Sequence, residues 1–424
     1  MLNTPAHLRR ESKSVGSDWL DVVALWAILF SLSGIGIWPH ATTGALQERL
    51  IINTYISYFS TAVGLIYIVR RAIFINLRPA PFSAYLVVFF VAFVGLSSLW
   101  SGDPVQSFTR SSRFIVFTIF VIVQFRYNPD FIKHVVIFSG FFAVINIGSL
   151  ILSHSHATEQ GWLSRAGDWR GLLAYRIALG STSATLMLIV VFDMLQTRVG
   201  AKFFAEFITA LGLLMLVYGS QARLAWGAAL LGLILLSVMM LVLRFPVRQR
   251  SLLSVFVVVF GFVISTAGAG LVPTIAEFWG RDLTFSGRTD LWPILIERAL
   301  LKPIYGYGVG VFFSGRETLE IVWQAARWGG FSTAHNSYIE WLIALGIPGA
   351  TLFALLMFFY YVRVLFALAA PQGSGSALIV ALAPLVTTQT VFMSEGAFPS
   401  VAWTIIALTV SSLGVARRVR KPTI

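Results

Sequence analysis

Residue types able to carry out chemistry gather in one polar stretch of the chain, residues 285–349. Arg288 lies near its start, and His335 lies near its end with Tyr338 and Glu340 just beyond. A guanidinium donates paired hydrogen bonds to anionic oxygens, and an imidazole takes up or releases a proton near neutral pH. A lone histidine in such a place also serves as a helix cap or an interface residue, so spacing alone leaves its role open.

Two short helices are predicted to position these side chains. The first covers residues 290–301, where apolar side chains recur at helical spacing, Pro293 lies in the first turn and Thr289 or Ser286 provides the N-cap. Pro303 ends this helix.

The second helix is predicted to begin at Asn336 and to run to Leu345. Gly346 and Pro348 stop it. This boundary places His335 at a helix start.

The residues expected of metal-dependent chemistry are missing from the sequence. It has no cysteine and no Asp-x-Asp pair, which a transferase using a sugar nucleotide would need as a metal clamp. His154 and His156 lie on a loop without a partnering Asp/Glu cluster and are weak as metal ligands. The glycines of 306–310 lack the Gly-Lys-Ser/Thr ending of a phosphate-binding loop and predict a tight turn. We therefore predict no metal and no cofactor, and a leaving group bound by Arg and Lys.

The rest of the chain is dominated by apolar runs of membrane-spanning length. Of 424 residues, 57% are hydrophobic and only 12% are charged, which excludes an ordinary soluble domain. We predict an all-α polytopic membrane protein with about twelve transmembrane helices, over residues 19–37, 51–69, 82–99, 114–125, 131–153, 177–196, 205–218, 224–243, 252–272, 347–365, 377–392 and 401–415.

Charge places the predicted segments on the two sides of the membrane. Most Lys and Arg fall in segments that would be cytoplasmic if both termini are inside, so the net charge of +13 mainly reflects topology and does not require nucleic acid. The predicted regions are a cytoplasmic tail (1–17), nine spans (18–272), a large periplasmic catalytic loop with short amphipathic helices (273–346), three spans (347–416) and a cytoplasmic tail (417–424). The start is too long and apolar for a cleaved signal peptide and predicts a permanent anchor.

Basic residues on the predicted outer side need another explanation than topology. They are Arg49, Arg110, Arg113, Arg165, Arg170, Arg176, Arg223, Arg281, Arg288, Arg298, Lys302, Arg316 and Arg327. Arg110 and Arg113, before the fourth span, would either anchor the helix at the lipid interface or contact a ligand. Arg223 would either reach the headgroups or serve a functional site.

Four passages resemble the superfamily of bacterial O-antigen ligases and Wzy-type polysaccharide polymerases. They are SQAR at 220–223, FSGRTDLW with Arg288, KPIYGYGVG, and AHNSYIEWLIALGIPG with His335. LSSLWSGDP and AGDWRGLLAYRIALG resemble its exopolysaccharide-polymerase branch. That branch has His-Lys-Asn where this chain has Tyr175, Arg176 and Ile177, so the choice between polymerase and ligase stays open.

The resemblance implies a glycosyltransferase in the bacterial inner membrane. Its donor would be a glycan on undecaprenyl diphosphate, and its acceptor a sugar hydroxyl on the periplasmic side, either a growing repeat unit or lipid A-core. The resemblance assigns diphosphate binding to Arg223 and Arg288 and the general base to His335. Accessory roles fall to Arg170, Arg176, Asp290, Glu340 and Tyr338.

A polysaccharide or lipid transporter is the competing class, because twelve spans is a common transporter count. Ion-coupled carriers place acids or histidines in mid-membrane, whereas the predicted spans contain almost none away from their ends, such as Asp193 and Glu206. The sequence therefore favours transfer over transport.

Overall fold

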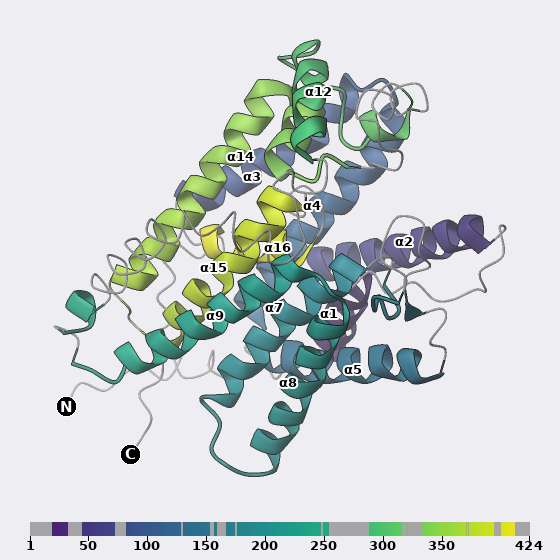
Figure 1. The fold of residues 1–424 in the computed structure, drawn as a ribbon. Coiled ribbons are helices and arrows are strands. Elements are labelled where there is room, and N and C mark those ends of the chain that lie inside the picture. The colour runs from purple at the N-terminus through teal and green to yellow at the C-terminus, as the bar shows by residue number, and fades with distance from the viewer. Residues whose placement is uncertain are drawn as a thin grey trace, which may run out of the picture.

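A computed structural model describes residues 19–32, 45–72, 82–128, 130–152, 157–158, 167–173, 176–246, 249–253, 288–315, 320, 333–369, 371, 373–393 and 400–411. Within them the chain forms helices, two short 3₁₀ turns and an isolated bridge between Thr158 and Trp169 (Figure 1). The α-helices are α1 (Trp19–Leu32), α2 (Ala45–Ala72), α3 (Phe82–Leu96), α4 (Pro104–Tyr127), α5 (Phe131–Leu152), α7 (Arg176–Met194), α8 (Ala201–Gly219), α9 (Arg223–Val242), α12 (Arg288–Leu300), α14 (Ser337–Ala369), α15 (Ser374–Phe392) and α16 (Val401–Ser411).

Eight of the described helices are long and apolar enough to cross a membrane, namely α3, α4, α5, α7, α8, α9, α14 and α15. The prediction of an all-α polytopic membrane protein is confirmed. The number twelve stays a prediction, because most of the predicted ninth span (252–272) and the C-terminal ends of the first and twelfth lie outside the described residues.

The helix of the fourth span is longer than the apolar run that predicts it. The apolar run predicts a start at residue 114, after a loop, but α4 begins at Pro104. Asp103 caps the helix by accepting a hydrogen bond from the Gln106 N–H at 3.0 Å, and proline suits the first helical position. The charges of Arg110 and Arg113 hid this first part of the helix from a hydropathy argument.

The structure corrects one cap and confirms one break. Thr289 lies inside α12 and is therefore not its N-cap, while Ser286 lies outside the described residues. Gly346, with φ of 70°, breaks α14 where the sequence predicted a stop, and the helix resumes through Pro348.

Beyond this break, α14 folds back on itself. Tyr338 and Phe353 would lie about 22 Å apart in a straight helix, yet their ring centroids are 5.1 Å apart. Trp341 also approaches Phe353, at 6.3 Å. A short arm, Ser337 to Leu345, therefore packs antiparallel to a long arm that starts at Ile347.

The predicted glycine turn caps the tip of this hairpin. Gly306, Gly308 and Gly310 all have positive φ. The Tyr307 N–H donates to the Ile343 carbonyl and the Gly308 N–H to the Ala344 carbonyl, both at 2.9 Å, so the turn satisfies carbonyls at the end of the short arm. A Cβ at Gly306 would meet the Ala344 backbone, so only glycine fits there.

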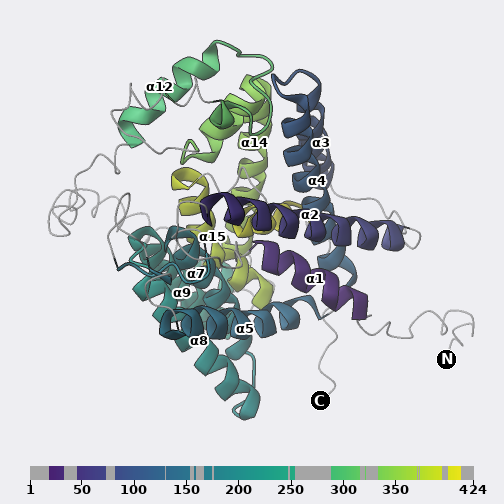
Figure 2. The same ribbon diagram turned by 90° about the vertical axis from the view of Figure 1, so that its right-hand side faces the viewer.

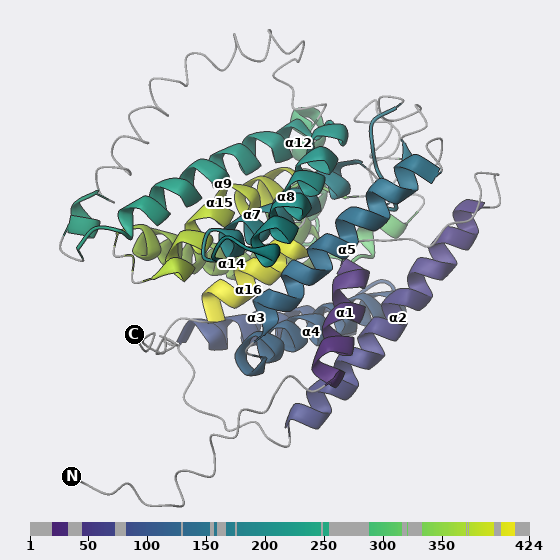
Figure 3. The same ribbon diagram turned by 90° about the horizontal axis from the view of Figure 1, so that it is seen from below.

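Helix α15 links the long arm of α14 to α9 (Figures 1 and 3). The Tyr361 hydroxyl lies 2.9 Å from the Thr387 hydroxyl, and Gly232 of α9 faces the Ala381 carbonyl. Both neighbours run antiparallel to α15, so α9 and the long arm of α14 are parallel. A buried aromatic group, made of Phe90, Phe114, Trp341, Phe353 and Trp403, joins the α14 hairpin to α3, α4 and α16.

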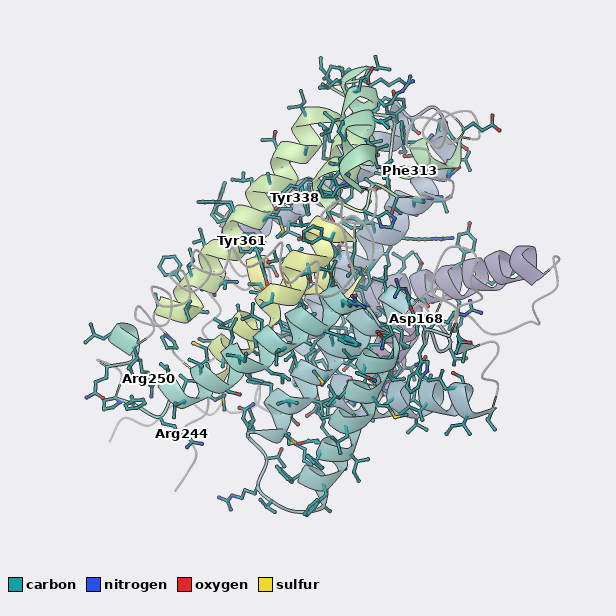
Figure 4. All side chains as sticks on the ribbon, in the orientation of Figure 1. Asp168, Arg244, Arg250, Phe313, Tyr338 and Tyr361 are labelled. Carbon is teal, nitrogen blue, oxygen red and sulfur yellow. The ribbon has the colours of Figure 1, made fainter. Side chains whose placement is uncertain are left out.

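In each of three described ion pairs, both residues belong to the same predicted side of the membrane. Arg71 pairs with Asp21 at 2.7 Å and Lys202 with Asp193 at 3.0 Å, all four being predicted cytoplasmic residues. Arg176 pairs with Asp168 at 2.7 Å, and both belong to the predicted outer side. In Figure 4, Arg244 and Arg250 lie at the opposite end of the bundle from Asp168 and Tyr338. Figure 2 shows α12 at the same end as the α14 hairpin.

Candidate functional site

His335 occupies a left-handed turn immediately before α14. Its φ is 50°, which is uncommon for a residue other than glycine and is often held in place by surrounding structure at functional positions. The helix is predicted to begin at Asn336 and begins one residue later; Asn336 caps it by accepting hydrogen bonds from the Tyr338 N–H at 2.9 Å and the Ile339 N–H at 3.3 Å. The His335 side chain is half-buried.

Ala334, the residue just before His335, is held at both of its main-chain polar groups. The Trp292 indole N–H donates to the Ala334 carbonyl at 3.0 Å, and the Ala334 N–H donates to the Glu340 carboxylate at 2.7 Å. Ala334 is fully buried in a small apolar cluster with Leu291, Leu295, Ala299, Phe312, Ile339 and Ile343. These contacts fix the backbone from which the imidazole projects.

The hydrogen bond from Trp292 to the Ala334 carbonyl also brings the Arg288 end of α12 toward His335. Arg288 is the first described residue of α12, one helical turn before Trp292, which contacts the neighbour of His335. The side chains of Arg288 and Asp290 lie outside what the structure describes, so only the placement of their backbone is known.

Glu340 and Tyr338 support the turn and the hairpin. The Glu340 carboxylate is 8% exposed and holds the Ala334 peptide, so it fixes the histidine through the main chain. The Tyr338 ring packs edge-on against Phe353, between the two arms of α14. Their predicted roles, in orienting the imidazole and in contacting substrate, stay predictions.

The SQAR passage forms a second left-handed turn. Gln221 has φ of 51°, and among the described non-glycine residues only Gln221 and His335 have a positive φ. Arg223 begins α9 directly after this turn, and its side chain is half-buried. The turn therefore fixes the direction from which Arg223 leaves the backbone.

The Trp-Arg-Gly loop packs against the SQAR turn. The Trp169 N–H donates to the Gly219 carbonyl at 2.9 Å, and the Trp169 ring fills the space that a side chain at Gly219 would occupy. Arg170 is 8% exposed, and its N–H donates to the Ala157 carbonyl at 2.9 Å. Two passages about fifty residues apart thus form one unit, and the accessory roles given to Arg170 and Arg176 stay predictions.

Arg176 ties this unit together at the start of α7. One guanidinium nitrogen donates both to the Asp168 carboxylate at 2.7 Å and to the Gln221 carbonyl at 3.2 Å. Both side chains of the ion pair are largely buried. Sequence reasoning missed Asp168 and Gln221; the spacing of Asp168 and Arg176 around the Trp-Arg-Gly passage was the available signal for the first, and nothing in the sequence marks the second.

Helix register places the two turns at the same level of the bundle. Thr387 of α15 contacts Tyr361 of α14, and the two helices are antiparallel, so Phe392, five residues after Thr387, lies level with Leu356. Leu356 in turn lies about one turn from His335 on the short arm of α14. Phe392 is also eleven positions beyond Ala381, which brings it level with Gln221 of the other neighbour. His335 and Arg223 thus lie at one level, to within about two helical turns.

Within the described residues, no group of three His, Cys, Asp or Glu side chains could hold a metal ion. His154 and His156 lie outside the described residues.

This arrangement defines a multi-pass membrane protein with an arginine- and histidine-bearing end. Residues 208–354 match the sequence model of the O-antigen ligase family, a region that includes Arg223, Arg288 and His335. The chain is also 25% identical, over 322 residues, to the exopolysaccharide production protein ExoQ of Rhizobium meliloti (strain 1021), which covers 74% of this chain and 72% of that protein. Both findings support the O-antigen ligase and Wzy-type polymerase superfamily, so the resemblance found in the sequence is confirmed.

Proposed function

We propose that the protein is an inner-membrane glycosyltransferase that moves a glycan from undecaprenyl diphosphate to an acceptor sugar hydroxyl on the periplasmic side. The most favoured activity is that of a surface or exopolysaccharide polymerase. The match to the O-antigen ligase family and to ExoQ supports a glycan as substrate. The end of the bundle that carries both turns would face the periplasm, and both termini would be cytoplasmic.

The proposed reaction is a displacement at the anomeric carbon of the donor. The acceptor oxygen forms the new glycosidic bond while the bond from that carbon to the diphosphate oxygen breaks. His335 takes the acceptor hydroxyl proton, and Arg223 and Arg288 hold the departing diphosphate. Charge-assisted hydrogen bonds of this kind are worth about 1.5–3 kcal/mol each. A general base contributes about 10²–10⁴ in rate. Arg170 is proposed to add positive charge beside this site.

The observation that carries the proposal is the pairing of the two strained turns. Each of the two described non-glycine residues with positive φ lies in a motif that the superfamily resemblance singled out, and register puts both at one level. Backbone strain of about 1–3 kcal/mol persists where surrounding contacts impose it, often where function needs a fixed direction. Here one turn directs an imidazole and the other a guanidinium.

Purified protein in lipid vesicles, supplied with a lipid-linked oligosaccharide donor and an acceptor, tests the proposal. Transfer should yield a new glycosidic bond and free undecaprenyl diphosphate, and EDTA should leave the rate unchanged. Recovery of the intact donor on the other side of the membrane, with no new bond, would instead identify a transporter.

A ligase that attaches polysaccharide to lipid A-core is the second candidate, because the matching family model is described as O-antigen ligase. Deleting the gene and separating surface polysaccharide on a gel discriminates between the two. A polymerase loss shortens the chains, whereas a ligase loss leaves full-length polymer unattached.

A further inference from the structure

Arg176 occupies a position that electrostatics disfavours. It is the first residue of α7, where the helix dipole places about half a positive charge, and a cation there is destabilised unless other contacts compensate. Asp168 provides that compensation through an ion pair of 2.7 Å that is largely removed from solvent. The same nitrogen then reaches the Gln221 carbonyl at 3.2 Å.

The Gln221 carbonyl belongs to the peptide that enters α9. Gln221 is held at φ of 51°, and Ala222 and Arg223 follow it directly. On the other side of the turn, the Trp169 N–H holds the Gly219 carbonyl at 2.9 Å. Trp169 and Arg176 thus bind the SQAR turn on the two sides of Ser220, which is fully buried.

We propose that Asp168 is a positioning residue for the donor site. It orients Arg176, Arg176 holds the Gln221 peptide in its left-handed conformation, and that conformation aims Arg223 at the donor diphosphate. Asp168 itself touches no reacting atom. This inference rests on the proposed function, because it deepens the role given to Arg223.

The two accessory arginines therefore differ in role. Arg176 donates hydrogen bonds to Asp168 and to the Gln221 carbonyl and so acts through the backbone of the SQAR turn. Arg170 lies in the Trp-Arg-Gly loop that packs against this turn. Asp168→Asn keeps the shape of the side chain but removes the charge that orients the guanidinium. The SQAR turn should then sample other conformations, and Arg223 should meet the diphosphate less often.

The test measures initial rates in vesicles with varied lipid-linked donor and, separately, varied acceptor. Asp168→Asn should raise the donor KM about 10-fold and leave the acceptor KM unchanged. A merely structural role would reduce the amount of active protein, lowering kcat with both KM values unchanged. Asp193→Asn is the matched control, since it removes an ion pair to Lys202 at the other end of the same helix and should alter neither KM.

A double-mutant cycle with Arg223→Lys decides whether Asp168 acts through Arg223. The two changes should be less than additive on donor kcat/KM, as expected for residues in one unit. Additive effects, or an unchanged donor KM in Asp168→Asn, would overturn the inference. If Asp168→Asn does not accumulate in the membrane, Asp168→Glu and Arg176→Lys should show the same selective rise in donor KM. Absence of transfer by the wild-type protein would reject the proposed function instead.

Discussion

The His335 turn and the Gln221 turn share one unusual backbone conformation but are built differently. Around His335, a neutral indole and a carboxylate hold the preceding peptide, and α12 supplies the indole. Around Gln221, an arginine in an ion pair holds the peptide of the strained residue itself. The first turn presents the side chain of its own strained residue, whereas the second sets the start of a helix.

This difference indicates which change each turn tolerates. The identity of the side chain at 335 should decide function, because the imidazole is what the turn presents. The identity of the side chain at 221 should matter less than its backbone conformation, because the functional guanidinium belongs to Arg223. Substitutions at four positions test this distinction, beginning with the largest expected effect.

Replacing His335 with alanine should abolish detectable polymer or conjugate formation, with a rate loss of about 10²–10⁴, because the proposed general base for the acceptor hydroxyl is removed. His335→Gly relaxes the backbone but also lacks the imidazole, so it should be equally inactive. Turnover assays with membrane protein levels checked by immunoblot measure both. Activity in the glycine variant would show that the turn and not the imidazole is what matters.

Replacing Arg223 with alanine should lower donor kcat/KM by about 10- to 100-fold or more, because each charge-assisted hydrogen bond lost from the diphosphate costs about 1.5–3 kcal/mol. Arg223→Lys should recover little, because an ammonium lacks the planar fork that holds two phosphate oxygens. Donor saturation curves measure this effect, and curves identical to wild type would argue against diphosphate binding. Arg250→Ala, at the other end of the bundle, serves as the control.

Gln221→Gly and Gln221→Val should differ in stability although both remove the amide. Glycine adopts positive φ readily, while a β-branched residue is strained there by about 1–2 kcal/mol. Thermal unfolding in detergent should show the valine variant destabilised and the glycine variant close to wild type. Equal unfolding temperatures would mean that the left-handed conformation is not retained.

Trp292→Phe removes the indole donor to the Ala334 carbonyl while keeping an aromatic ring. We expect a loss of about 0.5–1.5 kcal/mol in the free energy of unfolding and a small fall in kcat, because Glu340 still holds the other side of this peptide. Ser60→Ala, which removes a donor to the Ala27 carbonyl between α2 and α1, is the control and should change stability without changing turnover at His335.

Sequence patterns predicted local features of the site well. Gly346 and Pro348 marked the break in α14, Asn336 its start, and the glycines of 306–310 a tight turn, because each depends on the backbone preferences of a few neighbouring residues. The apolar rhythm likewise predicted α12.

Features that depend on distant partners were not predictable. Nothing local shows that the short arm of α14 returns along Phe353, or that Arg176 reaches Gln221. Hydropathy also misplaced the start of α4, because Arg110 interrupts the apolar run; its guanidinium donates to the Gly310 carbonyl at 2.7 Å. The sequence alone cannot distinguish a charged side chain on a helix that donates to a distant carbonyl from a charged side chain in a solvent-exposed loop.

The anchoring of Gly310 and Ala334 bears on how such a protein could change its substrate. The Gly310 carbonyl is fixed to α4 by Arg110 and Gln106, and Ala334 is fixed by Trp292 and Glu340. Because these contacts end on main-chain atoms, glycan preference could change through side chains elsewhere at this end of the bundle while the histidine stays where it is.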